Sequence, residues 1–421
     1  MARHTGMLRA FKRRNYRLWA AADFLSVAGA WMQVLGVNWL LLSISGSATS
    51  LGLGLFLQSA PTLLLAMFGG SLADRLPARP LVITGQVFHG LLAAALAVIA
   101  FNGPDHTGPI YLISALGGVV SAFCAPAIGR FAAEMVERED LSNALGLGSV
   151  ISSAARILGM GVAGALIPLI GTAALFAANA LSFTGVIAAV LLMRTGEMRI
   201  MPRATREESK ITDGLRYMLR TPWLLVVFGL AFALGSLGRN YQLTMAAMSQ
   251  GPLGAGAGGY GLLSVVFAVG AIIGGLVAAS RPRLGFRVLL VAGASISVFQ
   301  ALSGLAPGLP LFAALMLLIA VGAVVVDTTV AARIQLGTRE DMRGRVLAAQ
   351  SMVGAAAGAT GGPLLGVLCD TAGPRAALVL AGVVTTAATL TAAVLLVRIL
   401  GVRFPVLMPY RPAALVQSHA S

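Results

Sequence analysis

A few charged side chains of this chain lie inside long apolar stretches, where they can take part in chemistry that surface charges cannot. Two of them are the acids Asp23 and Asp327. A charged side chain at the depth of a lipid bilayer is costly unless it is paired or hydrated, and such residues are functional candidates by default. A carboxyl group that burial desolvates can take up a proton. We therefore predict Asp23, Asp327 and Glu134 as candidate proton-coupling residues.

Each acid also has a purely structural interpretation, as half of a permanent ion pair or as a carboxylate at the membrane surface. Glu134 lies four residues after Arg130. Residues at this spacing are neighbours on one face of a helix. We therefore expect Arg130 and Glu134 to pair, which leaves Asp23 and Asp327 as the stronger candidates for proton transfer.

The composition is that of a membrane protein. Of 421 residues, 57% are hydrophobic and 11% are charged, against about 45–50% and 25% in soluble domains. The net charge of +15 would suggest nucleic acid or anionic lipid by itself, but the apolar fraction favours the membrane, and we expect no nucleic-acid partner. The chain lacks a Gly-Lys phosphate-binding loop, a metal-binding histidine motif and a nucleophile elbow. We therefore predict no enzymatic activity, no cofactor and no bound metal.

Twelve apolar segments are long enough to cross a bilayer, which takes about 20 residues. A polar linker, in which we expect a short amphipathic helix on the membrane surface, separates the first six from the last six. We therefore predict an all-α integral membrane fold with a six-helix half at 1–197, a linker at 198–221 and a second half at 222–421. The predicted spans lie near 18–43, 49–73, 81–101, 109–131, 143–168, 171–193, 223–247, 257–280, 287–305, 310–334, 346–369 and 375–398.

The two halves carry a similar tripeptide at the same topological point. Residues 138–140 follow the fourth span and residues 339–341 follow the tenth, and both read Arg-Glu-Asp. Each Asp lies where an N-cap is needed for the next helix. Two six-span halves related by a repeat are a transporter architecture, in which the substrate site lies between the halves near the middle of the membrane.

Positive charge predicts the orientation of the chain. If the N-terminus is inside the cell, 25 of the 30 Lys and Arg residues fall on the cytoplasmic side. The positive-inside rule predicts this asymmetry. We therefore expect a multi-pass protein of the cell membrane with both termini in the cytoplasm and with its basic side against anionic lipid.

The loop between the second and third predicted spans reads GGSLADRLPAR over residues 69–79. It resembles the signature loop of the major facilitator superfamily, G-x-L-A-D-R-x-x-R-R/K. Residues 24–33, 130–140, 155–159 and 343–346 resemble the exporter-like branch of that superfamily, which includes the enterobactin exporter and many bacterial drug-efflux proteins. The resemblance covers about residues 8–400 and implies a twelve-helix fold and secondary active transport, most often proton-coupled efflux.

The resemblance also implies that the first, fourth, seventh and tenth helices line a central cavity. Polar side chains on these helices are candidate substrate contacts, although amides also serve simply as hydrogen-bond partners between helices. Arg239 could meet an anionic group of a substrate or close an outer gate. The candidate cavity residues are Gln33, Asn38, Arg239, Asn240, Gln242, Thr328 and Arg333.

Other residues of the resembling motifs are candidates for gating and packing. The Asp74 carboxylate can engage a helix N-terminus or an arginine of the other half, so we predict a latch between this loop and the start of the eleventh helix. The fifth helix lacks the proline usual in the antiporter motif but keeps Gly159, Gly161 and Gly164, which we predict to pack against neighbouring helices, and we interpret His89 as a packing residue. The candidate gating residues are Gly70, Asp74, Arg75, Arg79, Arg130, Arg156, Arg343 and Arg345.

The sequence thus predicts a monomeric, proton-coupled exporter of small amphipathic molecules, either drug-like compounds or a siderophore. One alternative is an importer or lipid transporter of the same fold. The other is a membrane scaffold or sensor that transports nothing, and the lack of any sizeable soluble domain argues against it.

Overall fold

The computed structural model describes residues 9–137, 141–198, 216–280, 284–339 and 342–400, and among these every regular element is a helix. Long apolar runs form helices in a membrane because a helix satisfies its own backbone hydrogen bonds. The elements are η1 (Arg9–Lys12), α1 (Arg14–Ser45), α2 (Ala48–Arg75), α3 (Ala78–Phe101), α4 (Gly108–Glu134), α5 (Leu141–Leu191), η2 (Thr195–Glu197), α7 (Pro222–Leu237), α8 (Tyr241–Gln250), α9 (Gly256–Ser280), α10 (Phe286–Gly304), α11 (Leu309–Gly337), α12 (Arg343–Ala372) and α13 (Pro374–Leu400).

Eleven of the described helical segments are long and apolar enough to cross a membrane. One of them, α5, has 51 residues and folds back at Gly171, whose φ of 73° is open to glycine and strained for other residues. It therefore provides two crossings, while α7 and α8 together provide one. The predicted twelve-helix all-α fold is confirmed. The amphipathic helix predicted in the linker falls mostly on residues outside the described ranges.

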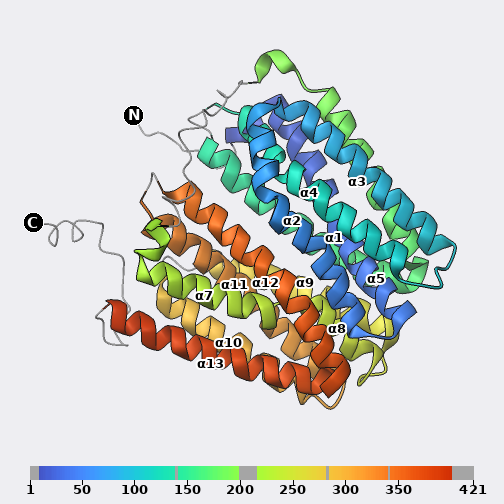
Figure 1. Ribbon diagram of the computed structural model, residues 1–421, viewed down its shortest axis with the longest axis vertical. Coiled ribbons are helices and arrows are strands. Elements are labelled where there is room, and N and C mark those ends of the chain that lie inside the picture. Colours follow the sequence, from blue (N-terminus) through green and yellow to red (C-terminus); the bar gives the residue numbers. More distant parts are fainter. Residues whose placement is uncertain (1–8, 138–140, 199–215, 281–283, 340–341, 401–421) are drawn as a thin grey trace, which may run out of the picture.

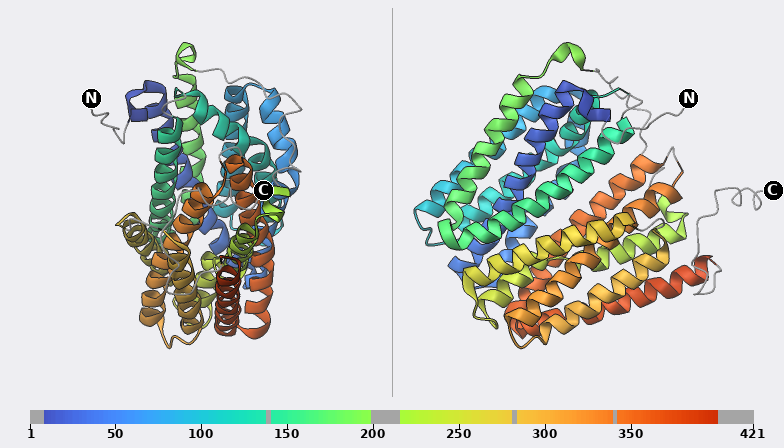
Figure 2. Two further views of the ribbon diagram at one scale, coloured as in Figure 1. Left: turned by 90° about the vertical axis from the view of Figure 1, so that its left-hand side faces the viewer. Right: turned by 180° about the vertical axis from the view of Figure 1, so that it is seen from behind.

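The helices form two bundles, one from α1–α5 and one from α7–α13 (Figure 1). We call the end that carries Arg14, Arg75, Arg79 and Arg398 the arginine-rich end. Figure 2 shows from two further sides that the helices of both bundles run roughly between this end and the opposite one.

Among the described residues, the two bundles share a buried hydrophobic cluster at the end opposite the arginine-rich one. One buried cluster there combines residues of both bundles, such as Leu41 and Phe176 from the first and Tyr260 and Phe312 from the second. At the arginine-rich end the buried clusters belong to one bundle each, around Phe131 in the first and around Leu289 in the second. Among the described residues, the halves therefore pack against each other at the opposite end, which we call the closed end, and no buried apolar cluster joins them at the arginine-rich end.

Glycines allow the closest approaches at the closed end, where α2 and α12 come together (Figure 1). A Cβ atom on Gly52 would overlap the backbone of Gly362, and one on Gly366 would overlap the backbone of Ala48. Asp370 of α12 adds polar contacts, because its carboxylate accepts hydrogen bonds from the Ser47 hydroxyl and from the backbone N–H groups of Ala48 (2.8 Å) and Thr49 (2.9 Å). The side chain of one half thus caps a helix N-terminus of the other.

The predicted packing glycines divide into two groups. Added Cβ atoms on Gly159 and Gly164 would overlap backbone atoms of Ala28 and Gly261, so both positions require glycine. At Gly161 an added Cβ would make only an ordinary contact of 3.7 Å with Ala268, so packing does not require glycine there. Gly70 has open space around it; its neighbour Gly69 packs against the α4 backbone instead.

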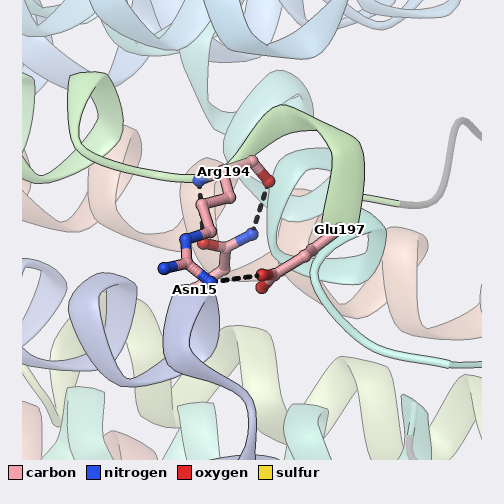
Figure 3. Close-up of polar contacts among 3 residues, drawn as sticks. All are labelled: Asn15, Arg194 and Glu197. Carbon is pink, nitrogen blue, oxygen red and sulfur yellow. Dashed lines mark hydrogen bonds and ion pairs between the residues drawn. The ribbon is translucent and has the colours of Figure 1, made fainter.

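Backbone contacts fix the arginine-rich end of the first bundle. The Asn15 side chain, 2% exposed, donates to the Arg194 carbonyl oxygen (2.9 Å) and accepts from the Arg194 N–H (3.1 Å), which ties the start of α1 to the end of α5 (Figure 3). Arg194 also pairs with the exposed Glu197 at 3.1 Å.

Candidate functional site

The seventh span is interrupted between α7 and α8, in the interior of the second bundle. Such a break frees carbonyl oxygens that lipid cannot satisfy, so it is tolerated only where protein or water compensates. Here the Asn240 side chain donates to the Ser236 carbonyl (2.7 Å), and Gln300 of α10, 3% exposed, donates to the Leu237 carbonyl (2.9 Å). Transporters place broken helices at their binding sites, and this break positions Arg239.

Arg239 forms an ion pair with Asp327 of α11. The two side chains are 32% and 35% exposed and line a cavity of about 260 Å³ in the second bundle, together with Gln350 and Gly354 of α12. A guanidinium beside the carboxylate compensates its charge. The spacing of these two residues in the sequence gave no sign of this pairing.

Arg156 lies about midway along the first part of α5 and not at the arginine-rich end, where an inner gate would form. Its guanidinium lies over the Trp31 ring of α1 at 5.7 Å, a cation–π contact. Its role as a gating residue stays a prediction.

A second cavity, of about 270 Å³, lies within the first bundle and is lined by α1, α2, α3, α4 and the second part of α5. It contains Asp23, for which no ion pair is found among the described residues. His89 also lines this cavity and stacks on Phe183, with the ring centroids 5.6 Å apart. His89 therefore packs as predicted, and it also shares a cavity with the unpaired acid.

Several amide side chains line the first-bundle cavity. Asn179 donates to the Gln33 side chain (2.7 Å), and Gln58 lines the wall nearby. Two further amides, Gln86 (6% exposed) and Asn38 (3% exposed), each have one buried atom without a protein partner, Gln86 Oε1 and Asn38 Nδ2. Buried polar atoms are almost always hydrogen-bonded to protein or water, so these two atoms mark places for water or a ligand.

Three further cavity candidates, Thr328, Arg333 and Gln242, line neither of these two cavities. Thr328 donates to the Val324 carbonyl of its own helix (2.8 Å). The Arg333 guanidinium lies over the Phe286 ring at 4.0 Å, within the core of the second bundle. Gln242 is half-buried in α8, two residues after Asn240.

The gating candidates of the first bundle bind within their own half. Arg130 pairs with Glu134 (3.2 Å), as the four-residue spacing predicts, and donates to the Ala73 carbonyl (2.8 Å). Arg79 donates to the Val190 carbonyl (3.0 Å) near the end of α5, a contact within the first bundle, and the latch stays a prediction. Arg75 is exposed. The side chains of Asp74, Arg343 and Arg345 lie outside the described part of the structure.

Sequence reasoning missed four residues that the structure makes important: Gln86, Asn179, Gln300 and Asp370. Three of them are amides on helices that the resemblance treats as peripheral. The signal that could have found them is their polarity, since each is an isolated polar residue in an apolar span.

Two six-helix bundles, closed at one end and enclosing charged cavities, define a membrane transporter of the alternating-access type. The comparisons agree with this class. A family model described as transmembrane secretion effector, of the major facilitator superfamily, matches residues 5–405. The chain belongs to this family.

Curated relatives match parts of the chain at low identity. The staphyloferrin A transporter of Staphylococcus aureus is 25% identical over 164 residues, which cover 39% of this chain and 41% of that protein. Multidrug resistance protein 2 of Bacillus subtilis is 25% identical over 187 residues, which cover 43% of this chain and 46% of that protein. The matched segments thus span less than half of either relative.

Solved structures show the same fold. The nucleoside transporter NupG, crystallised as its D323A mutant, has a TM-score of 0.73 at 12% identity, over 91% of this chain and 100% of that one. A bacterial homologue of the human lysosomal transporter Spinster, in an inward-facing and unoccupied conformation, has a TM-score of 0.67 at 14% identity, over 91% and 97% of the two chains.

Proposed function

We propose that this protein is a proton-coupled exporter of small amphipathic molecules, and that Asp23 carries the coupled proton. The observation that supports this most directly is the unpaired Asp23 carboxyl in a polar cavity of a transporter fold. The curated relatives named for a siderophore and for multidrug resistance support this kind of substrate.

Protonation is one of the two ways in which an acid inside the membrane avoids an uncompensated charge, and pairing with a cation is the other. Asp327 is paired with a cation, because Arg239 lies against it. Asp23 has no cation against it among the described residues, so protonation is the way left to it. The unpartnered atoms of Gln86 and Asn38 provide places for the water through which a proton reaches Asp23. His89, in the same cavity, is a further group able to exchange protons with that water.

The conformation of the two bundles supports loading of the substrate from the cytoplasm. Among the described residues, no buried apolar cluster joins the bundles at the arginine-rich end, which the positive-inside rule assigns to the cytoplasm. In this state a molecule loads from the cytoplasm. Export then requires the contacts around Asp370 to open and the arginine-rich end to close, with Asp74, Arg343 and Arg345 as the proposed inner latch.

Inverted membrane vesicles with an imposed pH gradient test this proposal, with a panel of cationic, neutral and anionic fluorescent amphipathic compounds. We expect gradient-dependent accumulation of at least one compound, and we expect Asp23→Asn to remove the dependence on the gradient. Asp105→Asn changes an exposed acid and is the matched control, with unchanged transport expected. Accumulation that is indifferent to the gradient, or an unaffected Asp23→Asn variant, contradicts the proposal.

A further inference from the structure

An apolar groove of about 450 Å³ lies between the two halves, with Leu63 of α2 in its first-bundle wall. The contact between α2 and α12 extends as far as Ser59 and Gly358, where an added Cβ on the glycine would lie 3.8 Å from the serine hydroxyl. Leu63 lies one helical turn beyond Ser59, so the groove adjoins this contact on its arginine-rich side. The second-bundle wall includes Phe228 and Phe232 of α7 and Met352 and Ala356 of α12.

The groove lies at the depth of one leaflet of the membrane. Phe228 and Phe232 are six and ten residues after Pro222, where α7 begins at the arginine-rich end (Figure 1), or about 9 and 15 Å along the helix. The hydrocarbon core of a bilayer is about 30 Å thick. The groove therefore extends toward the middle of the membrane from the side that the positive-inside rule assigns to the cytoplasm. Phe232 and Met352 are 40% and 49% exposed, so hydrocarbon can reach the groove.

The groove adjoins the cavity that contains the ion pair of Arg239 and Asp327. Val353 of α12 lines both spaces. Glycine leaves room on each side of this valine, because an added Cβ would meet nothing within 4 Å on Gly229, in the groove, or on Gly354, in the cavity. An apolar compartment and a charged compartment therefore meet at one valine side chain.

A molecule that occupies both compartments must be amphipathic. A polar head in the groove would lose its hydrogen bonds, whereas in the cavity Arg239 can donate to it and Asp327 can accept from it, since each is about a third exposed. A hydrocarbon chain gains little by moving from lipid into the groove, because lipid is equally apolar. The head therefore provides the preference for this site, and the groove accommodates the chain attached to it.

We propose that the transported molecule is a single-chain amphiphile that enters from the cytoplasmic leaflet, with its hydrocarbon chain in the groove and its polar head beside Arg239 and Asp327. This inference rests on the proposed transport function and names the class of its substrate. Asp327 lies ten residues before the end of α11 at the arginine-rich end, about 15 Å deep. A bilayer phospholipid keeps its head at the membrane surface, so it does not fill both compartments.

Photolabelling of the purified full-length protein in lipid nanodiscs tests this without transport or a pH gradient. The probe is dodecylphosphocholine with a diazirine near the end of its chain, and mass spectrometry locates the labelled residues. We expect Phe232 and Met352 to be labelled about tenfold more than Leu181, a 69% exposed residue of α5 outside the groove. Excess unlabelled dodecylphosphocholine should remove the labelling of the groove and leave that of Leu181.

Two comparison probes carry the same diazirine. Phosphatidylcholine has the same head but two chains and a place in the bilayer, and dodecane has the same chain but no head. We expect neither to favour the groove over Leu181, because the first keeps its head at the membrane surface and the second has no head for the cavity to bind.

Gly229→Leu fills the groove, so we expect it to lower labelling of Met352 by the single-chain probe several-fold. Gly185→Leu is the matched control, because it changes an exposed glycine of α5 that also has open space around it, and labelling should not change. Ala356→Leu narrows the same groove from α12 and repeats the test if Gly229→Leu does not fold.

Three outcomes overturn the inference. They are equal labelling of the groove and Leu181 by dodecylphosphocholine, labelling of the groove by either comparison probe as strong as that by dodecylphosphocholine, and full labelling in both groove-filling variants. Strong labelling by phosphatidylcholine would make the groove a site for bilayer lipid only. The vesicle experiment with Asp23→Asn measures coupling to the pH gradient, which photolabelling does not require, so either proposal can fail without the other.

Discussion

The two halves of the molecule hold an acid inside the membrane in opposite ways. In the second bundle Asp327 pairs with Arg239, and the amide of Gln300 satisfies the broken helix that positions this arginine. In the first bundle Asp23 has no cation beside it among the described residues, and its cavity contains buried amide atoms without protein partners. The comparison teaches that similar residues can have different surroundings, since one carboxylate lies against a cation and the other, among the described residues, does not.

The largest expected effect comes from breaking the paired half. Arg239→Ala leaves the Asp327 carboxylate without its partner, and we expect a loss of about 2–4 kcal/mol in the free energy of unfolding, less than for a fully buried pair because the groups are a third exposed. Asp23→Ala should change stability by less than about 1 kcal/mol, since no ion pair is lost. Denaturant unfolding in detergent measures both. Equal losses of stability in the two single variants would contradict the difference between the paired and the unpaired acid. The double variant Arg239→Ala/Asp327→Ala should recover part of the stability that Arg239→Ala loses.

Two buried amides, Gln300 and Gln86, test the same difference between the two halves. Gln300→Leu leaves the Leu237 carbonyl unsatisfied at the helix break, and we expect it to destabilise the protein by about 1–3 kcal/mol. Gln86→Leu removes an atom that has no protein partner, so its cost should be below about 1 kcal/mol. Thermal unfolding of the two variants side by side checks the difference. If Gln86→Leu is the more damaging, the first-bundle cavity is a structural network and not an open site.

The Asp370 carboxylate stabilises the contact between the halves at the closed end. Asp370→Asn weakens the hydrogen bonds to the start of α2, so the closed end should open more often. The neighbouring Cys369, 3% exposed, provides a native reporter once Cys124 is replaced by serine. We expect the alkylation rate of Cys369 by a maleimide to rise several-fold. An unchanged rate would show that the glycine contacts alone keep this end closed.

The smallest effect is expected at the surface. Glu197→Gln removes the exposed ion pair with Arg194, and we expect a change below about 0.5 kcal/mol in the free energy of unfolding that disappears at high salt. It is the reference against which the effect of Arg239→Ala is judged. A loss as large as that of the intramembrane pair would mean that burial is not what makes the latter important.

The sequence was sufficient for the fold, because the length and apolarity of the spans determine where helices cross a membrane. It also predicted the Arg130–Glu134 pair, whose members are neighbours on one helix. It could not predict the Arg239–Asp327 pair or the Asp370 cap, because these join residues far apart in the chain, and their contacts depend on how the helices pack. For the same reason it could not separate Arg333, which lies over Phe286, from the arginines of the cavity.

The most direct test of the account is to find which acid takes up a proton. Infrared difference spectra of the purified protein, recorded between mildly acidic and mildly alkaline buffer, detect protonated carboxyl groups one residue at a time when compared with Asn variants. We predict a carboxyl band that disappears in Asp23→Asn and persists in Asp327→Asn. A band that persists in Asp23→Asn and disappears in Asp327→Asn would contradict the account.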